Sequence, residues 1–268
     1  MASLTVVGTG IMFPSQMTFE AAEAIRSADI TLFNVGNHAL AVDWLKENAR
    51  AHVDLYGFYG DGKSRKSTYD EMVAAIMDEL RAGRDVVAAF YGHPGVFVGP
   101  GYQAMKEARA EGFDAQMLPG VSAVDCMFAD LEFDPAVYGC VMVEASDYVL
   151  MERDYDPRMP LILWQAGVVG DISFNAKGHA TAESEDMLKR RLLRDYPKDH
   201  PIITYIAATL PGMTAKTRSA TISTLEELEL NASSTCLVPP IYSGAFDQEL
   251  GETFLKMMRA SVREEEAA

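Results

Sequence analysis

Short apolar runs rich in β-branched residues alternate with helical patterns through the first half of this 268-residue chain. The clearest runs are "LTVVG" (4–8), "ITLFN" (30–34) and "DVVAAFYG" (85–92). Such alternation indicates a parallel sheet with helices on its faces, because each strand must return to the same edge of the sheet through a crossover. We therefore expect an α/β fold with a mostly parallel N-terminal sheet.

The segments between these runs have helical patterns. We expect helices at 18–28, 39–48 and 101–111, a strand near 52–56, and a further helix opening at Ser67 or Thr68. In that last helix Glu71 follows Thr68 by three residues, which is the capping-box spacing. Five apolar side chains then form one stripe: Met72, Val73, Ile76, Met77 and Leu80.

The second half has a different texture. Four apolar runs, "CVMVEAS", "LILWQAG", "PIITYIA" and "STCLVPPIY", are accompanied by helical patterns at 123–129 and 183–196, which favours a mixed, more antiparallel sheet. We expect an N-terminal α/β domain with the catalytic loop at 1–120, a C-terminal α/β domain completing the site at 121–242, and a helical tail at 243–268. The amphipathic tail is expected to dock on a partner subunit or on the body of its own chain.

Composition excludes several classes of protein. A formal net charge of −16 argues against a nucleic-acid binder, which needs clustered Lys and Arg. The sequence has neither a run of about 20 apolar residues nor a signal-peptide pattern, so we expect a cytoplasmic protein without a membrane span. Cys126, Cys140 and Cys236 form no C-x-x-C pair, so the sequence predicts buried thiols and no zinc site.

Three loops are rich in Gly, Pro or both: "VGTG" (7–10) and "YGHPGVF" (91–97), which follow predicted strands, and "LPGVSAV" (118–124), which precedes a predicted helix. Loops at the carboxyl ends of parallel strands commonly bind ligands. The first loop is not a dinucleotide fingerprint, because Phe13 stands where the third glycine belongs. In the last loop Ser122 has the position of a helix N-cap, next to exposed backbone amides.

The segment "FYGDGKSRKSTYDEM" (58–72) places two tyrosines, Tyr59 and Tyr69, on either side of Arg65. A solvated turn needs none of these side chains, so a group held over a substrate is one interpretation. The alternative is a tyrosine-rich loop that packs on the sheet, with Arg65 in a surface ion pair to Asp61 or Asp70.

Over residues 3–241 these motifs, with Trp164–Gln165, "TLEEL" and "STCLVPP", resemble the tetrapyrrole (corrin and porphyrin) methylase superfamily. The resemblance implies a methyltransferase of two α/β domains with S-adenosylmethionine in the cleft between them and S-adenosylhomocysteine as product. Members that act on tetrapyrroles usually carry G-D-P, whereas this chain has His93 between Gly92 and Pro94.

That departure and the tyrosine segment resemble a narrower branch, the borosin peptide backbone α-N-methyltransferases. The resemblance implies a catalytic set of Tyr59, Arg65, Tyr69 and Tyr91. It also implies methylation of a precursor peptide in the biosynthesis of ribosomally made natural products. We expect a split member acting on a separate precursor, as a homodimer or as a heterotetramer with two precursors.

Methylation of a backbone amide requires an acid–base set of this kind, because resonance makes the amide nitrogen a very poor nucleophile. A base must remove the N–H proton while donors stabilise charge on the oxygen. We assign Tyr59 as base, Arg65 as the cation that stabilises its phenolate, Tyr69 as donor to the amide oxygen, and Tyr91 as the group orienting the amide or the methyl donor. Lys66 is the alternative cation.

The same resemblance implies a set of residues that contact the cofactor, and we expect no metal, because the sulfonium already makes the methyl group electrophilic. These residues are Gly8, Gly10, His93, Val96, Phe97, Ser122, Ala123, Gln165, Tyr205, Ser234 and Thr235.

Two other functions remain open at this stage. One is a methylase of tetrapyrroles or other small molecules, which turnover of a precorrin would favour. The other is a non-catalytic partner that binds S-adenosylmethionine and a peptide, which binding without methyl transfer would favour.

Overall fold

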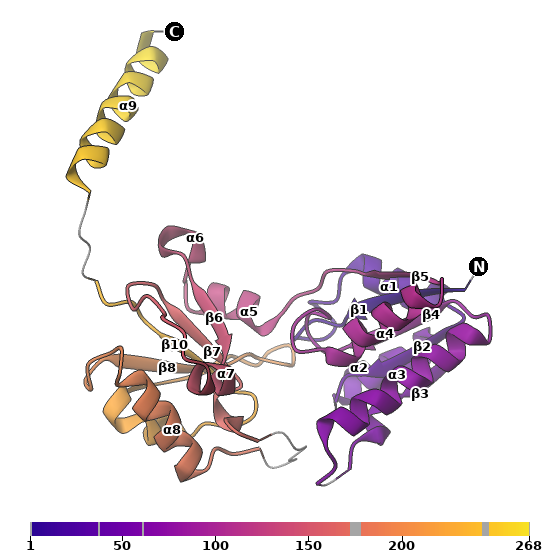
Figure 1. The fold of residues 1–268 in the computed structure, drawn as a ribbon. Coiled ribbons are helices and arrows are strands. Elements are labelled where there is room, and N and C mark those ends of the chain that lie inside the picture. Colours follow the sequence, from indigo (N-terminus) through magenta and orange to yellow (C-terminus); the bar gives the residue numbers. More distant parts are fainter. Residues whose placement is uncertain (1, 37, 61, 172–177, 243–246, 268) are drawn as a thin grey trace.

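The structure is a computed structural model that describes residues 2–36, 38–60, 62–171, 178–242 and 247–267. Two five-stranded sheets lie side by side, one from each half of the chain (Figure 1). The expected two-domain α/β fold is confirmed.

The first sheet is entirely parallel, with strand order β3-β2-β4-β1-β5. Its strands are β1 (Ser3–Gly8), β2 (Ile30–Asn34), β3 (His52–Asp54), β4 (Val86–Phe90) and β5 (Asp114–Met117). The central strand β4 is buried at every position, as the run of small and β-branched residues "VVAAF" requires of a strand covered on both faces. All five carboxyl ends therefore lie along one edge.

Helices cover both faces of this sheet. The helices are α1 (Phe19–Ser27) and α2 (Ala39–Asn48) on one face and α3 (Arg65–Arg81) and α4 (Gly99–Ala110) on the other. Side chains of successive strand residues lie on opposite faces of the sheet. Val6 and Ala88 pack in the hydrophobic core beneath α3 and α4, whereas Val7 and Ala89 pack in the core beneath α1 and α2. This two-residue alternation follows from strand geometry.

The start of α3 corrects one prediction. The N-cap is Ser64, whose Oγ accepts a hydrogen bond from Ser67 N at 3.1 Å, and Thr68 lies buried inside the helix. The expected start at Ser67 or Thr68 was therefore wrong by one turn, because an equally good capping residue stands earlier. As a result Arg65 and Tyr69 lie four residues apart on one helix, and side chains at that spacing share a face.

The second sheet is mixed, with order β6-β7-β10-β8-β9. Its strands are β6 (Val141–Glu144), β7 (Leu161–Trp164), β8 (Pro201–Ile206), β9 (Lys216–Thr221) and β10 (Thr235–Val238). Only the β6–β7 pair is parallel. One face packs with α7 (Ala145–Leu150) and α8 (Ala182–Leu192), and the other with α5 (Ala123–Asp130).

Shorter elements complete the chain. They are α6 (Pro135–Tyr138) and the 3-10 helices η1 (Leu55–Phe58), η2 (Ala166–Val168) and η3 (Ile222–Leu228). The buried side chain of Ile11, from the N-terminal half, joins the α5 core. The two domains are therefore held together partly by apolar contact.

The last helix, α9 (Gln248–Ala267), extends away from the body in Figure 1. It does not dock on its own chain, and its Leu250 and Phe254 side chains are exposed.

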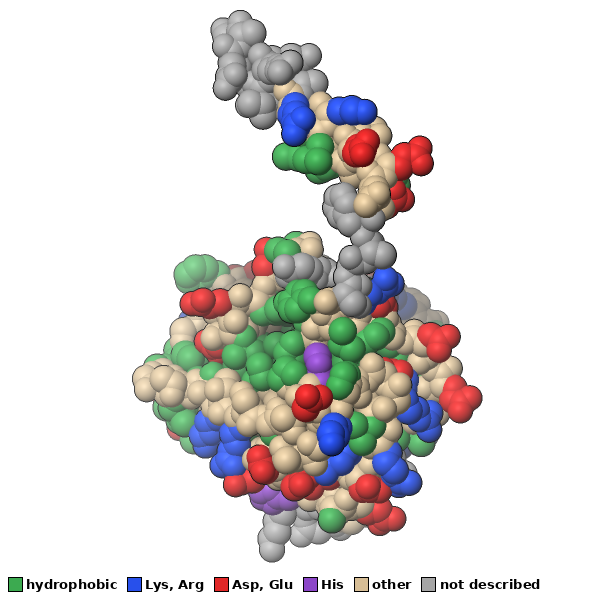
Figure 2. Space-filling view, turned by 90° about the vertical axis from the view of Figure 1, so that its left-hand side faces the viewer, with side chains coloured by type: hydrophobic (Ala, Val, Ile, Leu, Met, Phe, Trp, Pro, Cys, Tyr) green, Lys and Arg blue, Asp and Glu red, His purple; other side chains and the backbone are tan. Residues whose placement is uncertain are grey.

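Apolar side chains also gather on the outer face of the C-terminal domain (Figure 2), where Phe133, Pro239 and other residues line a groove. Docking of the tail on a partner subunit stays a prediction. Within the described residues, no helix combines the length and apolar character that crossing a bilayer demands.

Candidate active site

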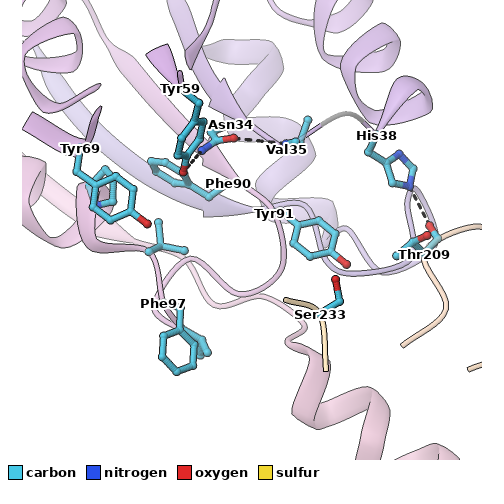
Figure 3. A pocket seen from close by; sticks show the side chains of 14 residues that line it. Asn34, Val35, His38, Tyr59, Tyr69, Phe90, Tyr91, Phe97, Thr209 and Ser233 are labelled. Carbon is cyan, nitrogen blue, oxygen red and sulfur yellow. Dashed lines mark hydrogen bonds between the residues drawn. The ribbon is translucent and has the colours of Figure 1, made fainter. Parts of the chain in front are cut away.

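A cavity of about 530 Å³ lies at the carboxyl edge of the first sheet and brings three of the predicted catalytic residues together (Figure 3). Tyr59 follows η1, Tyr69 lies on the first turns of α3, and Tyr91 directly follows β4. The other lining residues are Asn34, Val35, Gly36, His38, Phe90, Val96, Phe97, Val98, Pro100, Thr209 and Ser233. None of the lining residues is Asp, Glu, Lys or Arg.

Tyr59 is held by a polar contact that the sequence did not predict. Its Oη accepts a hydrogen bond from Asn34 Nδ2 at 3.4 Å. The pKa of Tyr59 is raised to about 12, chiefly by burial and also by the neighbouring Tyr69, while the Asn34 hydrogen bond and the charge of Arg65 act to lower it. Burial outweighs the guanidinium, so Tyr59 is a neutral phenol at pH 7 in this site, although the charge of Arg65 favours its phenolate.

The neighbouring cations differ in where they act. The Lys66 side chain is 85% exposed, and its Nζ forms an ion pair with Asp70 Oδ2 at 2.6 Å. Arg65 is half-buried and acts on Tyr59 electrostatically. Of the two cations, Arg65 is the one whose charge lowers the pKa of Tyr59. Asp70 is engaged by Lys66, and Asp61, the other expected partner of Arg65, lies outside the described residues.

The loop after β4 is braced by the glycines of "VGTG". Gly10 N donates to Gly92 O at 3.3 Å, and Gly92 N donates to Gly10 O at 2.9 Å. A Cβ on Gly8 would stand 2.1 Å from Gly92 O, so only glycine fits there. Neither Gly8 nor Gly10 lines the cavities described here. These two glycines instead allow the backbone after β1 to pass close to the Tyr91–Pro94 loop.

Tyr91 and His93 face the site from that loop. Tyr91 is 39% exposed at the open cavity, and loss of hydration, with a smaller contribution from Cys126, raises its pKa to about 12. His93 Nδ1 accepts a hydrogen bond from Gly95 N at 2.9 Å. With Nδ1 as acceptor, the neutral ring carries its proton on Nε2.

A second cavity of about 340 Å³ adjoins the first, and both are lined by Tyr91, Val96, Phe97, Thr209 and Ser233. Four further residues expected at the cofactor line it: His93, Ser122, Ala123 and Gln165. A smaller recess of about 100 Å³ adds Ser234 and Thr235. Most of the residues assigned to the cofactor are therefore gathered beside the tyrosines.

The wall of the second cavity contains two strained residues. Phe97 and Gln165 have φ of 57° and 56°, a left-handed conformation that is rare for side chains of their size. The Phe97 ring packs edge-on against Trp164, with 4.9 Å between centroids. Strain of this kind persists where surrounding structure imposes it, commonly at functional sites.

Ser122 caps α5 as expected. Its Oγ donates to Asp125 Oδ2 at 2.9 Å and its N donates to the same oxygen at 2.6 Å. Tyr205, by contrast, is fully buried, donates from Oη to Asp130 Oδ2 at 2.6 Å, and lines none of these cavities. Its burial raises its pKa further above the usual tyrosine range.

The donor set of the second cavity fits a sulfonium nucleoside. Apolar walls from Ile11, Val96 and Phe97 suit a base and a methyl-bearing sulfur, and Ser122 and Gln165 offer hydrogen bonds to polar ends. Among the described residues, no group of three or more His, Cys, Asp or Glu side chains is placed to hold a metal.

Four polar lining residues were not predicted from the sequence: Asn34, His38, Thr209 and Ser233. Asn34 is a polar residue at a strand end, a signal that was available. His38 Nε2 lies 2.9 Å from Thr209 O, a contact between the two domains. A hydrogen bond between residues so far apart in the chain produces no local sequence pattern, so this contact could not be predicted from the sequence.

Comparison with known proteins agrees with this arrangement. The family model described as Tetrapyrrole (Corrin/Porphyrin) Methylases matches residues 3–226. The chain belongs to this family. Among solved structures, cobalt precorrin-4 methyltransferase superposes with a TM-score of 0.62 at 16% identity, covering 88% of this chain and 94% of that one. Uroporphyrin-III-C-methyltransferase from Thermus thermophilus gives 0.62 at 20% identity, with 89% and 94% covered. Both similarities concern the fold.

Within the tetrapyrrole methylases, the sequence resemblance to borosin enzymes is confirmed. The chain is 44% identical to the methyltransferase/ribosomally synthesized cyclic peptide dendrothelin A precursor of Dendrothele bispora, over 89% of this chain and 58% of that protein. It is 42% identical to the corresponding omphalotin A precursor of Omphalotus olearius, with the same coverage. The chain thus spans somewhat less than two thirds of the length of these relatives.

Proposed function

We propose that this chain transfers methyl groups from S-adenosylmethionine to backbone amide nitrogens of a precursor peptide. The observation that carries the proposal is the junction of the two cavities. The tyrosine-lined cavity and the cavity of Ser122 and Gln165 share Tyr91, Val96 and Phe97 as a common wall. An amide in the first cavity therefore lies next to a methyl donor in the second.

The residues of the first cavity supply what amide methylation needs. Tyr59 takes the N–H proton, and Tyr69 donates a hydrogen bond to the amide oxygen, where negative charge develops. Tyr91 stands between the cavities and orients the amide. Because the pKa of Tyr59 is raised to about 12, only a small fraction of it is phenolate at neutral pH. The rate of proton removal is then set by how well the site stabilises that phenolate.

The second cavity holds the cofactor in this proposal. Ser122, Gln165 and Ser233 bind its polar ends, and Val96 and Phe97 enclose its apolar part. When bound, S-adenosylmethionine supplies a methyl group made electrophilic by its sulfonium. Tyr91 and Phe97 line both cavities, so they stand where that methyl group would pass to the amide.

The peptide assignment rests on the first cavity and on the relatives. Both relatives named above are by their names methyltransferases and precursors of ribosomally synthesized cyclic peptides. A cavity of about 530 Å³ without Asp, Glu, Lys or Arg in its lining suits a segment of uncharged peptide better than a tetrapyrrole, which bears several carboxylates. A separate precursor, a homodimer and a heterotetramer with two precursors remain predictions.

The test is co-expression with a candidate precursor, such as the product of a neighbouring short open reading frame. Intact and tandem mass spectrometry would then locate mass increments of one CH₂ per methyl group. Increments on fragments that place them on backbone nitrogens support the proposal. Turnover of a precorrin would instead support the small-molecule alternative. Binding of S-adenosylmethionine and peptide without transfer would support the non-catalytic alternative.

A further inference from the structure

Asn34 connects two of the catalytic tyrosines. It is the last residue of β2 and pairs in register with Phe90 of β4. Its backbone oxygen accepts a hydrogen bond from Tyr91 N at 3.2 Å. The main chain of Asn34 thereby fixes where Tyr91 leaves the sheet.

The side chain of Asn34 is oriented by its neighbours. Its Oδ1 accepts a hydrogen bond from Gly36 N at 3.4 Å, and this leaves Nδ2 to face Tyr59 Oη at 3.4 Å (Figure 3). Since a backbone N–H donates to one end of the amide, the other end is assigned as NH₂. The group facing the phenol is therefore a hydrogen-bond donor, and it lies at the wall of the first cavity.

We propose that Asn34 is a positioning residue for methyl transfer, which holds Tyr59 and stabilises its phenolate through the Nδ2–H donor. The inference rests on the proposed function and adds a role that the tyrosine–arginine pattern does not contain. A direct donor favours the charged form of the group that accepts it. Arg65 does not line the cavity, and the hydrogen bond from Asn34 opposes the effect of burial more strongly than the field of Arg65 does.

A purely structural role makes a different prediction. If Asn34 only terminates β2, its side chain is replaceable as long as its main-chain bond to Tyr91 persists. The proton affinity of Tyr59 would then be independent of residue 34. The two roles are separated by measuring that affinity directly.

The first experiment replaces Tyr59 with a fluorinated tyrosine, whose more acidic phenol titrates in an accessible range, and follows its ¹⁹F shift with pH. Asn34→Leu should raise the midpoint by about one pH unit, because a hydrogen bond to a charged group is removed. Asn34→Asp, which places an acceptor and a charge at the same point, should raise it further. The control Asn48→Leu, at the end of α2, should leave it unchanged.

An unchanged midpoint in a folded Asn34→Leu protein would overturn the inference. If that variant does not fold, Asn34→Ala decides in the same way, because it removes the donor without adding a charge. This readout needs neither cofactor nor peptide, so it stands even if the proposed function fails.

The second experiment is a double-mutant cycle on single-turnover methylation. Asn34→Leu should slow transfer about tenfold at fixed pH in the wild-type background, which corresponds to that one-unit shift. In a Tyr59→Phe background it should have little further effect, because the residue acts through Tyr59. Equal losses in both backgrounds would contradict the inference. Absence of transfer by the wild-type enzyme would instead contradict the proposed function.

Discussion

His38 Nε2 lies 2.9 Å from the backbone oxygen of Thr209, so one hydrogen bond joins the start of α2 to the loop after β8 across the mouth of the first cavity (Figure 3). The Nδ1 atom of the same ring accepts from Ala41 N at 3.3 Å, which makes His38 the N-cap of α2. With Nδ1 as acceptor, the neutral ring donates from Nε2. His38 therefore fixes both a helix end and the contact between the domains.

His38→Asn is expected to separate these two roles. Asparagine is a good N-cap, so α2 should be preserved, whereas the shorter side chain loses the hydrogen bond to Thr209 O. A typical hydrogen bond contributes about 1 kcal/mol net. We therefore expect the KM for peptide to rise by roughly fivefold with a smaller change in kcat, measured by steady-state kinetics. An unchanged KM would show that the contact does not shape peptide binding.

Tyr69→Phe is expected to slow methyl transfer by roughly two to three powers of ten, since loss of an oxyanion donor typically costs about 2.7–4 kcal/mol in barrier. The ring itself should stay in place, because it packs over Gly99. Single-turnover rates and melting curves would be compared with those of Tyr242→Phe, which removes a hydroxyl from an exposed residue outside the cavity. Wild-type rates in Tyr69→Phe would remove this residue from the mechanism.

The pH dependence follows from the raised pKa of Tyr59, about 12. If Tyr59 is the base, the single-turnover rate should rise about tenfold per pH unit from pH 7 to 9, because the phenolate fraction does. Tyr59→Phe should abolish that slope. A rate that is flat over this range would show that proton removal by Tyr59 does not limit transfer.

The free energy of unfolding should fall as the pH rises, in contrast to the methylation rate. Tyr59, Tyr91 and Tyr196 have pKa values raised by burial to about 12, against about 10 in an unfolded chain. Their contribution to folding is fully present below pH 10 and is lost as the pH rises toward 12, because the unfolded chain releases its protons first. Denaturant unfolding between pH 8 and 11 should show this loss of free energy. Undiminished stability at pH 11 would contradict it.

The strain at Phe97 gives a prediction that compares two variants. Phe97→Gly and Phe97→Ala both lose the packing against Trp164, but only glycine relaxes the left-handed backbone. The free energy of unfolding of the glycine variant should exceed that of the alanine variant by about 1 kcal/mol. Methyl transfer should be lost in both variants, because both open the junction between the two cavities. Chemical denaturation measures the difference. An alanine variant as stable as the glycine variant would show that the backbone there is not strained.

Local patterns were sufficient for most of the fold. The helix at 39–48 was predicted with its structural bounds, and the strand "DVVAAFYG" (85–92) contains β4 and extends two residues beyond its end, because apolar periodicity and capping both act locally. The strands β5 "DAQM" and β9 "KTRSAT" were missed, because they lack an apolar pattern and are stabilised by their neighbours in the sheet.

The structure gathers most of the predicted site residues around adjoining cavities, but the pKa of Tyr59 could not be predicted from the sequence. The spacing of Tyr59 and Tyr69 was informative, and the structure brings both to one cavity with Tyr91. The balance between burial and Arg65 depends on how deeply Tyr59 is enclosed, which no local pattern specifies. The same holds for Tyr205, whose hydroxyl is committed to Asp130 across a core.

The most direct test of the account is a crystal structure with S-adenosylhomocysteine and a precursor peptide. The account predicts the sulfur in the cavity of Ser122 and Gln165, with an amide nitrogen facing it at the shared wall and both Tyr59 and Tyr69 within hydrogen-bonding distance of that amide. A peptide bound away from the tyrosines, or a cofactor bound outside the second cavity, would contradict it.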